Sequence, residues 1–98
     1  MTITTAPTAS YIRSESRLRP EQVNTSLADA AALEADIAAR IATYRAVINK
    51  KVTGVTDSPD NQTIATESLA KRVLASLYGS AGYLNPAYWE RALSLIHI

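Results

Sequence analysis

The strongest pattern along the chain is an amphipathic repeat between Pro20 and Val52. At 100° per residue its apolar positions fall within an arc of roughly 120°, whereas charged residues such as Asp36 and Arg40 lie outside that arc. The apolar positions are Val23, Leu27, Ala30, Leu33, Ile37, Ile41, Tyr44, Ile48 and Val52. The repeat predicts one long amphipathic helix over residues 20–52 with a single buried face.

The ends of this segment carry helix signals. Pro20 suits the first turn of a helix, and two lysines followed by a glycine suit its C-terminal end. A break near residues 24–26 is an alternative, because Ser26 is able to cap a helix that begins at Leu27. The sequence leaves both arrangements open.

A second amphipathic segment follows a connector over residues 53–62, which is rich in Gly, Pro, Asp and Asn. The predicted helix starts from a cap at Asn61 or Thr63 and runs to about Tyr78. Its apolar face carries Leu69, Ala70, Val73, Leu74 and Leu77. The side expected to face away from the core carries Lys71, Arg72, Ala75 and Ser76.

The last segment predicts a third helix with an unusually wide apolar surface. Asn85 suits the N-cap and Pro86 the first helical position, while Leu84 would pack on Trp89 as a hydrophobic staple. The apolar arc reaches about 160°, although a helix packed on one neighbour needs only about 100°. We therefore expect another protein to cover part of it. The candidate interface residues are Tyr88, Trp89, Leu93, Leu95, Ile96 and Ile98.

Residues 78–89 hold four of the six aromatic side chains of the chain. Such a cluster is typical of a core corner between two helices, of a protein interface, or of a platform that stacks nucleobases. Stacking platforms usually accompany a basic groove, and no Lys or Arg occurs between Arg72 and Arg91. Core and interface roles are therefore favoured.

The first residues differ in character from the rest. Residues 1–9 are Thr-rich with an early proline, which favours an extended tail that is loose unless it lies against a surface such as a second copy. A short helix is expected over residues 10–18. The expected fold is all-α: a small bundle of three to four helices with a long central amphipathic helix, forming a single helical domain over residues 10–98 behind the tail.

Composition narrows the function classes. The chain has 98 residues, a net charge of +1 and no cysteine. The absence of cysteine excludes a disulfide framework and thiolate metal or redox chemistry, and suits synthesis in a reducing cytoplasm. No uninterrupted apolar run of about 20 residues occurs, so no membrane-spanning segment is expected.

Candidate catalytic chemistry is sparse. His97 is the only histidine, and no second group near it in the sequence would orient it as a base or share a metal. Asp57 and Asp60 flank Pro59, but their spacing fits a solvated turn better than a calcium loop. We expect no catalytic residue, no metal site and no cofactor, and therefore a non-enzymatic protein.

Two sets of charged residues are candidates for binding. Glu34 and Arg45 lie near the edge of the apolar face of the long helix, where a charged side chain either reaches solvent or pairs with a group of another helix or subunit. Arg13, Arg17 and Arg19 form the one local basic cluster. They fit a solvated face or, in many copies, a surface that faces DNA.

The order of these parts resembles the small head–tail connector (adaptor, or head-completion) proteins of tailed bacteriophages. The likeness covers about residues 10–96 and is carried by YIRSESRL, ALEADIAARIATYRAVI, ESLAKRVLASLYGSAGY and NPAYWERALSLI. It implies a virion protein of the phage neck that forms a closed ring, commonly a dodecamer. It also implies binding to the portal protein and to a tail or stopper protein, with DNA passing through the ring without sequence-specific contact.

An alternative is a small helical nucleic-acid-binding or regulatory module that uses Arg13, Arg17 and Arg19. Steep dependence of DNA binding on salt would identify such a module. An enzyme or an accessory subunit of an enzyme is the least supported class, because the residues that carry acid–base or covalent chemistry are missing or isolated.

Overall fold

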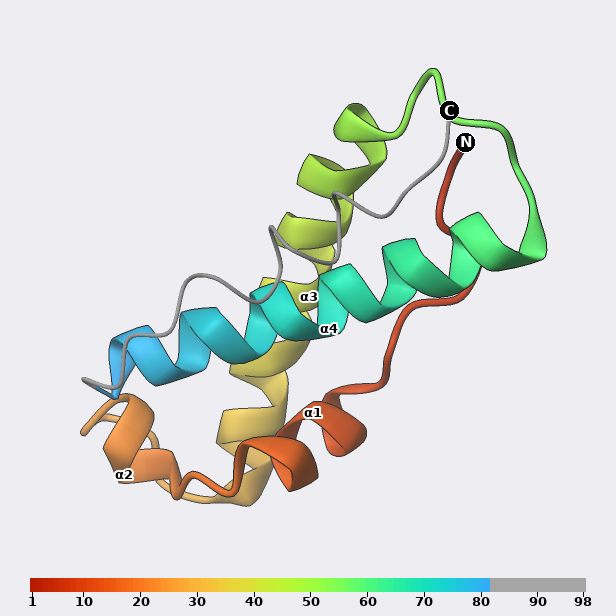
Figure 1. Cartoon of the computed structure of the whole chain (residues 1–98). Helices are drawn as coiled ribbons and strands as arrows, with labels where there is room; N and C mark the ends of the chain where they lie inside the picture. Colours follow the sequence, from red (N-terminus) through yellow and green to blue (C-terminus); the bar gives the residue numbers. More distant parts are fainter. Residues whose placement is uncertain (82–98) are drawn as a thin grey trace.

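The computed structural model describes residues 1–81, and this part of the chain contains four α-helices and no strand (Figure 1). They are α1 (Ala9–Ser16), α2 (Pro20–Val23), α3 (Ala30–Lys51) and α4 (Pro59–Ser80). The predicted all-α fold with a long central helix is confirmed. The predicted helix that begins near Asn85 lies outside the described residues.

The continuous helix predicted over residues 20–52 is wrong, because α2 and α3 are separated by residues 24–29. The break lies where the alternative placed it, but the cap is a different residue. Ser26 Oγ donates to Asn24 Oδ1 at 2.8 Å, whereas Asp29 Oδ1 accepts from the backbone N–H of Ala32 at 2.9 Å. Asp29 therefore caps α3, directly before the alanine-rich stretch that has the higher helix propensity.

The start of α4 also differs from its prediction. Ser58 Oγ accepts from the backbone N–H of Asn61 at 3.2 Å, and Pro59 occupies the first helical position. Asn61, one of the two predicted caps, is instead buried inside the helix and donates from Nδ2 to the carbonyl of Thr56 at 2.8 Å. The helix thus begins earlier than predicted, and the connector is shorter.

A single apolar core joins the tail, the four helices and the loop after α3. α3 and α4 cross and pack on each other, while α1 and α2 each pack against both of them (Figure 1). The predicted faces of α3 and α4 supply most of this core. Its buried residues are Ile3, Ile12, Val23, Leu33, Ile37, Ile41, Ile48, Val52, Val55, Ala65, Leu69, Val73 and Leu77.

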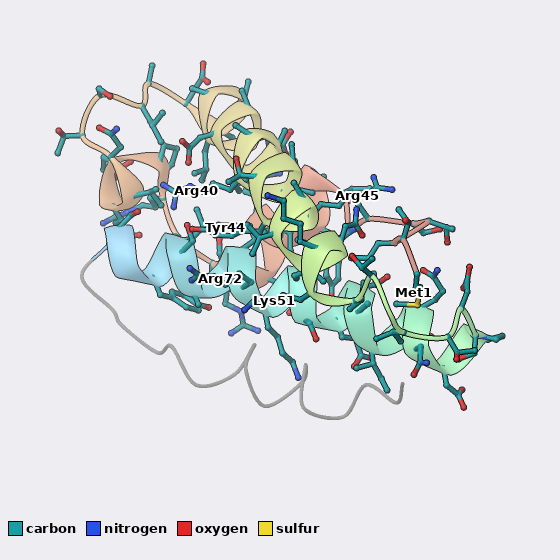
Figure 2. The ribbon with its side chains drawn as sticks, turned by 90° about the horizontal axis from the view of Figure 1, so that it is seen from above. Met1, Arg40, Tyr44, Arg45, Lys51 and Arg72 are labelled. Atoms are coloured by element: carbon teal, nitrogen blue, oxygen red, sulfur yellow. The ribbon has the colours of Figure 1, made fainter. Side chains whose placement is uncertain are left out.

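Polar side chains also join α3 to α4. Arg40 donates to Asp36 Oδ2 at 2.8 Å and reaches across to α4, where it donates to the hydroxyls of Ser76 and Ser80. The Arg72 guanidinium lies 4.4 Å from the ring centroid of Tyr44 (Figure 2). Arg72 and Ser76 therefore face α3, which differs from the prediction that they point away from the core.

The N-terminal tail lies on its own chain. It runs beside the first turns of α4 (Figure 1). Ile3 is only 1% exposed. The tail therefore lies against a surface, as the sequence-based expectation required of an ordered tail, and here that surface belongs to its own chain. Burial of one large apolar side chain gives this polar segment the anchor that its Thr-rich composition did not reveal.

We expect Leu69→Ala to lower the free energy of unfolding by about 2–5 kcal/mol, because it removes fully buried methyl groups between α4 and its neighbours and leaves a cavity. Urea denaturation measures the change. Val47→Ala is the matched control, since Val47 is 40% exposed and a surface change of this kind shifts stability by about 0.5 kcal/mol or less. Equal effects of the two substitutions would contradict this core.

Candidate functional site

The most elaborate polar arrangement in the described part of the chain is the surface that holds the tail. We call it the tail-binding surface and define it by Arg45 and Asn49 of α3 and Gln62 and Thr66 of α4. All four side chains contact backbone atoms of residues 2–5. The two helices thus bind the tail from both sides.

Ile3 is the centre of this contact. Its backbone N–H donates to Asn49 Oδ1 at 2.9 Å, and its carbonyl accepts from Arg45 Nη2 at 2.6 Å. Its side chain is buried in the common core. Both polar groups of the residue are therefore satisfied while its apolar side chain leaves water, which is the requirement for burying an extended backbone.

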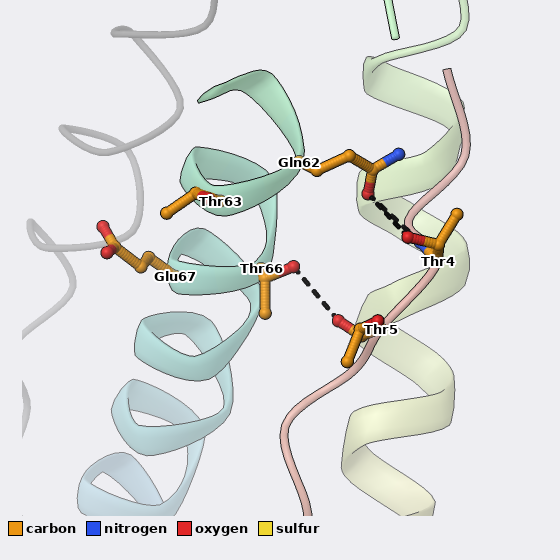
Figure 3. A pocket seen from close by; sticks show the side chains of 6 residues that line it. All are labelled: Thr4, Thr5, Gln62, Thr63, Thr66 and Glu67. Atoms are coloured by element: carbon orange, nitrogen blue, oxygen red, sulfur yellow. Dashed lines mark hydrogen bonds between the residues drawn. The ribbon is translucent and has the colours of Figure 1, made fainter. Parts of the chain in front are cut away.

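Gln62 contacts the tail on both sides of Ile3. Its Oε1 accepts from the backbone N–H of Thr4 at 3.2 Å, and its Nε2 donates to the carbonyl of Thr2 at 2.8 Å. Asp57 Oδ1 also accepts from Nε2, at 3.0 Å, and so helps to orient the amide. Thr66 Oγ1 donates to the carbonyl of Thr5 at 3.1 Å (Figure 3).

The amino group of Met1 reaches the C-terminal end of α3. It donates to the carbonyls of Val52 and Thr53 at 3.0 and 3.2 Å. Carbonyls at a helix C-terminus lack intrahelical partners and carry the negative end of the helix dipole, so a cation there is favourable. These contacts extend the bound segment over residues 1–5.

Within residues 1–81, two surface pockets lie along α4. The first, of about 300 Å³, lies between the tail and α4 and is lined by Thr4, Thr5, Gln62, Thr63, Thr66 and Glu67 (Figure 3). The second, of about 400 Å³, lies between α1 and α4 and is lined by Tyr11, Glu15, Glu67, Ala70, Lys71 and Leu74. Glu67 lines both pockets. In residues 1–81 no three His, Cys, Asp or Glu side chains gather where they could hold a metal ion.

Two sets of charged residues were predicted as binding candidates, and the structure brings neither set together. The first set is Glu34 and Arg45, and the second is the three arginines at positions 13, 17 and 19. Glu34 Oε1 accepts from Arg13 Nε at 2.6 Å, which joins α3 to α1 within the chain. Arg45 instead contacts the tail. The two residues proposed for an interface therefore have separate intrachain contacts, and the partner of Glu34 is one of the three candidate DNA-facing arginines.

The other two arginines lie in the turn between α1 and α2. Arg17 follows α1 in the left-handed conformation with φ 55°, which ends the helix and redirects the chain. Arg19 Nε lies 3.2 Å from Glu21 Oε1 in an exposed ion pair. With Arg13 and Arg19 each beside a carboxylate, the three arginines form no continuous basic strip.

The predicted apolar interface residues Tyr88, Trp89, Leu93, Leu95, Ile96 and Ile98 lie outside the described residues. Sequence reasoning missed the tail-binding surface, although a signal for it exists. Ile3 is the only large apolar residue between Met1 and Tyr11, and Arg45 and Asn49 lie one helical turn apart at the edge of the α3 core face.

Comparisons with models of protein families, with curated proteins and with solved structures found no match. The likeness to phage connector proteins therefore stays a prediction from the sequence. Within the described part of the chain, none of the helices combines the length and the apolar character that crossing a membrane requires.

We expect Ile3→Ala to speed hydrogen exchange of the backbone amides at positions 3 and 4 by roughly tenfold or more, since the lost burial weakens tail binding. Amides in the middle of α3 should keep their protection because the tail opens locally. Thr2→Ala is the control: Thr2 is exposed and contributes only its carbonyl. Unchanged protection at positions 3 and 4 in Ile3→Ala would contradict this anchor.

A double-mutant cycle with Arg13→Gln and Glu34→Gln should give a coupling free energy of about 0.2–1 kcal/mol that falls as salt is added. The pair is short, but its side chains are 39% and 35% exposed, so water already screens them. Urea denaturation of the four variants measures the coupling. A coupling of several kcal/mol, independent of salt, would contradict a partly solvated pair.

Proposed function

We propose that this chain is a structural, non-enzymatic subunit of the neck of a tailed bacteriophage. Copies of it form a ring, of twelve in the expected case, between the portal protein and a tail or stopper protein. DNA passes through the ring without sequence-specific contact. The protein is made in the host cytoplasm and ends in the virion.

The sequence feature that carries the proposal is the wide apolar arc predicted for residues 85–98, which follow the described helical part of the chain. An arc of about 160° exceeds what one neighbouring helix covers. A head-to-tail ring uses two different patches on every subunit, so a short chain in such a ring carries more apolar surface than a monomer would.

The described helices support the same reading. The segments YIRSESRL, ALEADIAARIATYRAVI and ESLAKRVLASLYGSAGY, whose order resembles connector proteins, begin within α1, α3 and α4 respectively. The described part of these segments therefore agrees with a helical subunit.

The charges of the described part favour passage of DNA over tight binding of it. Arg13 donates to Glu34, and Arg19 lies beside Glu21. Phosphate contacts give strong binding only when many cations are free to replace the counterions of DNA. A ring with this surface would bind DNA weakly and without sequence specificity.

The test is the mass of the purified chain in solution over a range of concentrations, by analytical ultracentrifugation. We expect a ring-sized species that Leu95→Asp reduces to monomers, because a charge in the apolar arc opposes its burial. Ser94→Asp is the control, since it adds the same charge outside the arc. Equal masses for the natural chain and Leu95→Asp at every concentration would contradict the proposal, as would steeply salt-dependent DNA binding by the monomer.

A further inference from the structure

The tail is attached to its own domain almost entirely through distant residues. The hydrogen bonds of residues 1–5 reach partners between 42 and 61 positions away, on α3, on α4 and just after α3. Residues 6–8 are the connector, which is the covalent connection between this segment and α1. The segment is therefore held by its contacts with α3 and α4 and by burial of Ile3, and its link to α1 is short.

The tail of any copy of this chain is able to make the same contacts with the tail-binding surface. Apart from Ile3, the surface binds the tail chiefly through backbone N–H and carbonyl groups, with one weaker side-chain contact from Thr4. It thus selects an extended peptide with a branched apolar side chain at one position. The N-terminal tail of this protein is the ligand of known fit.

We propose that the tail-binding surface also binds the tail of a second copy of this chain, so that neighbouring subunits exchange residues 1–5. Exchange keeps every contact that the tail makes within its own chain, so the contact free energy is the same in both arrangements. The balance between them depends on the connector and on how close the second copy lies.

The connector suits this exchange. Pro7 disfavours helical backbone at Ala6, and Thr8 is extended with φ −82° and ψ 152°. Three extended residues span about 10 Å at most. The tail therefore reaches only a copy that lies directly beside its own, and exchange links adjacent subunits rather than distant ones.

Exchange of the tail does not require a ring or a phage partner. It concerns the tail-binding surface, whereas the proposed ring depends on residues 85–98. Cross-linking between two copies and the mass of the assembly are separate readouts, so either proposal can fail while the other stands.

The experiment uses the absence of cysteine from the chain. One full-length variant carries Thr5→Cys in the tail and another carries Thr63→Cys on α4. Both residues are exposed, line the same pocket, and use no side-chain atom to bind the tail to the surface. The two variants are mixed, equilibrated and treated with a short bis-maleimide.

We expect a cross-linked heterodimer whose yield rises with protein concentration. The matched control pairs Thr5→Cys with Thr25→Cys, an exposed position in the loop before α3, at the opposite end of that helix from the tail. Ile3→Asp in the tail variant should reduce the heterodimer about tenfold or more, to the level of this control, because the buried anchor is lost.

The double variant Thr5→Cys/Thr63→Cys, at low concentration, shows whether the tail occupies the surface within one chain. Internal cross-linking of this variant together with a heterodimer yield no higher than the control at every concentration would overturn exchange. A double variant that fails to link internally would overturn the proposal as well, because the tail would then not occupy the surface at all.

Discussion

The packing of α3 on α4 is the contact on which the other described elements depend. α1 and α2 each pack against both helices, and the tail hydrogen-bonds to both. The contact rests on fully buried aliphatic side chains such as Ile37, Leu69 and Val73. Burial of each such side chain is worth about 1.5–3 kcal/mol. The shared core therefore fixes the positions from which α3 and α4 contact α1, α2 and the tail.

Polar groups at the margin of that core set its geometry. Arg40 joins α3 to two serines of α4, and Arg72 lies over Tyr44. Partly solvated contacts of this kind contribute little stability singly, but they require a defined direction and distance. They therefore favour one alignment of the two helices, and the tail-binding surface, which draws on both, depends on that alignment.

The two proposed assembly elements lie at opposite ends of the chain and differ in chemistry. The tail is recognised through backbone hydrogen bonds around one buried isoleucine. The arc predicted for residues 85–98 is apolar, and its binding would depend on the apolar area that it buries. A subunit with both would combine a contact that specifies its neighbour with one that supplies most of the association free energy.

The sequence by itself determined the helical class and the core faces, because both follow from local periodicity: Leu33, Ile37, Leu69 and Leu77 are all buried as predicted. The exact caps and the partners of charged residues were decided by tertiary structure. Asp29 caps α3, whereas the sequence pointed to Ser26 as the cap at this break, and Arg45 binds a backbone carbonyl of the tail. Such choices depend on which distant segments meet, and a pattern with a period of 3.6 residues carries no information about that.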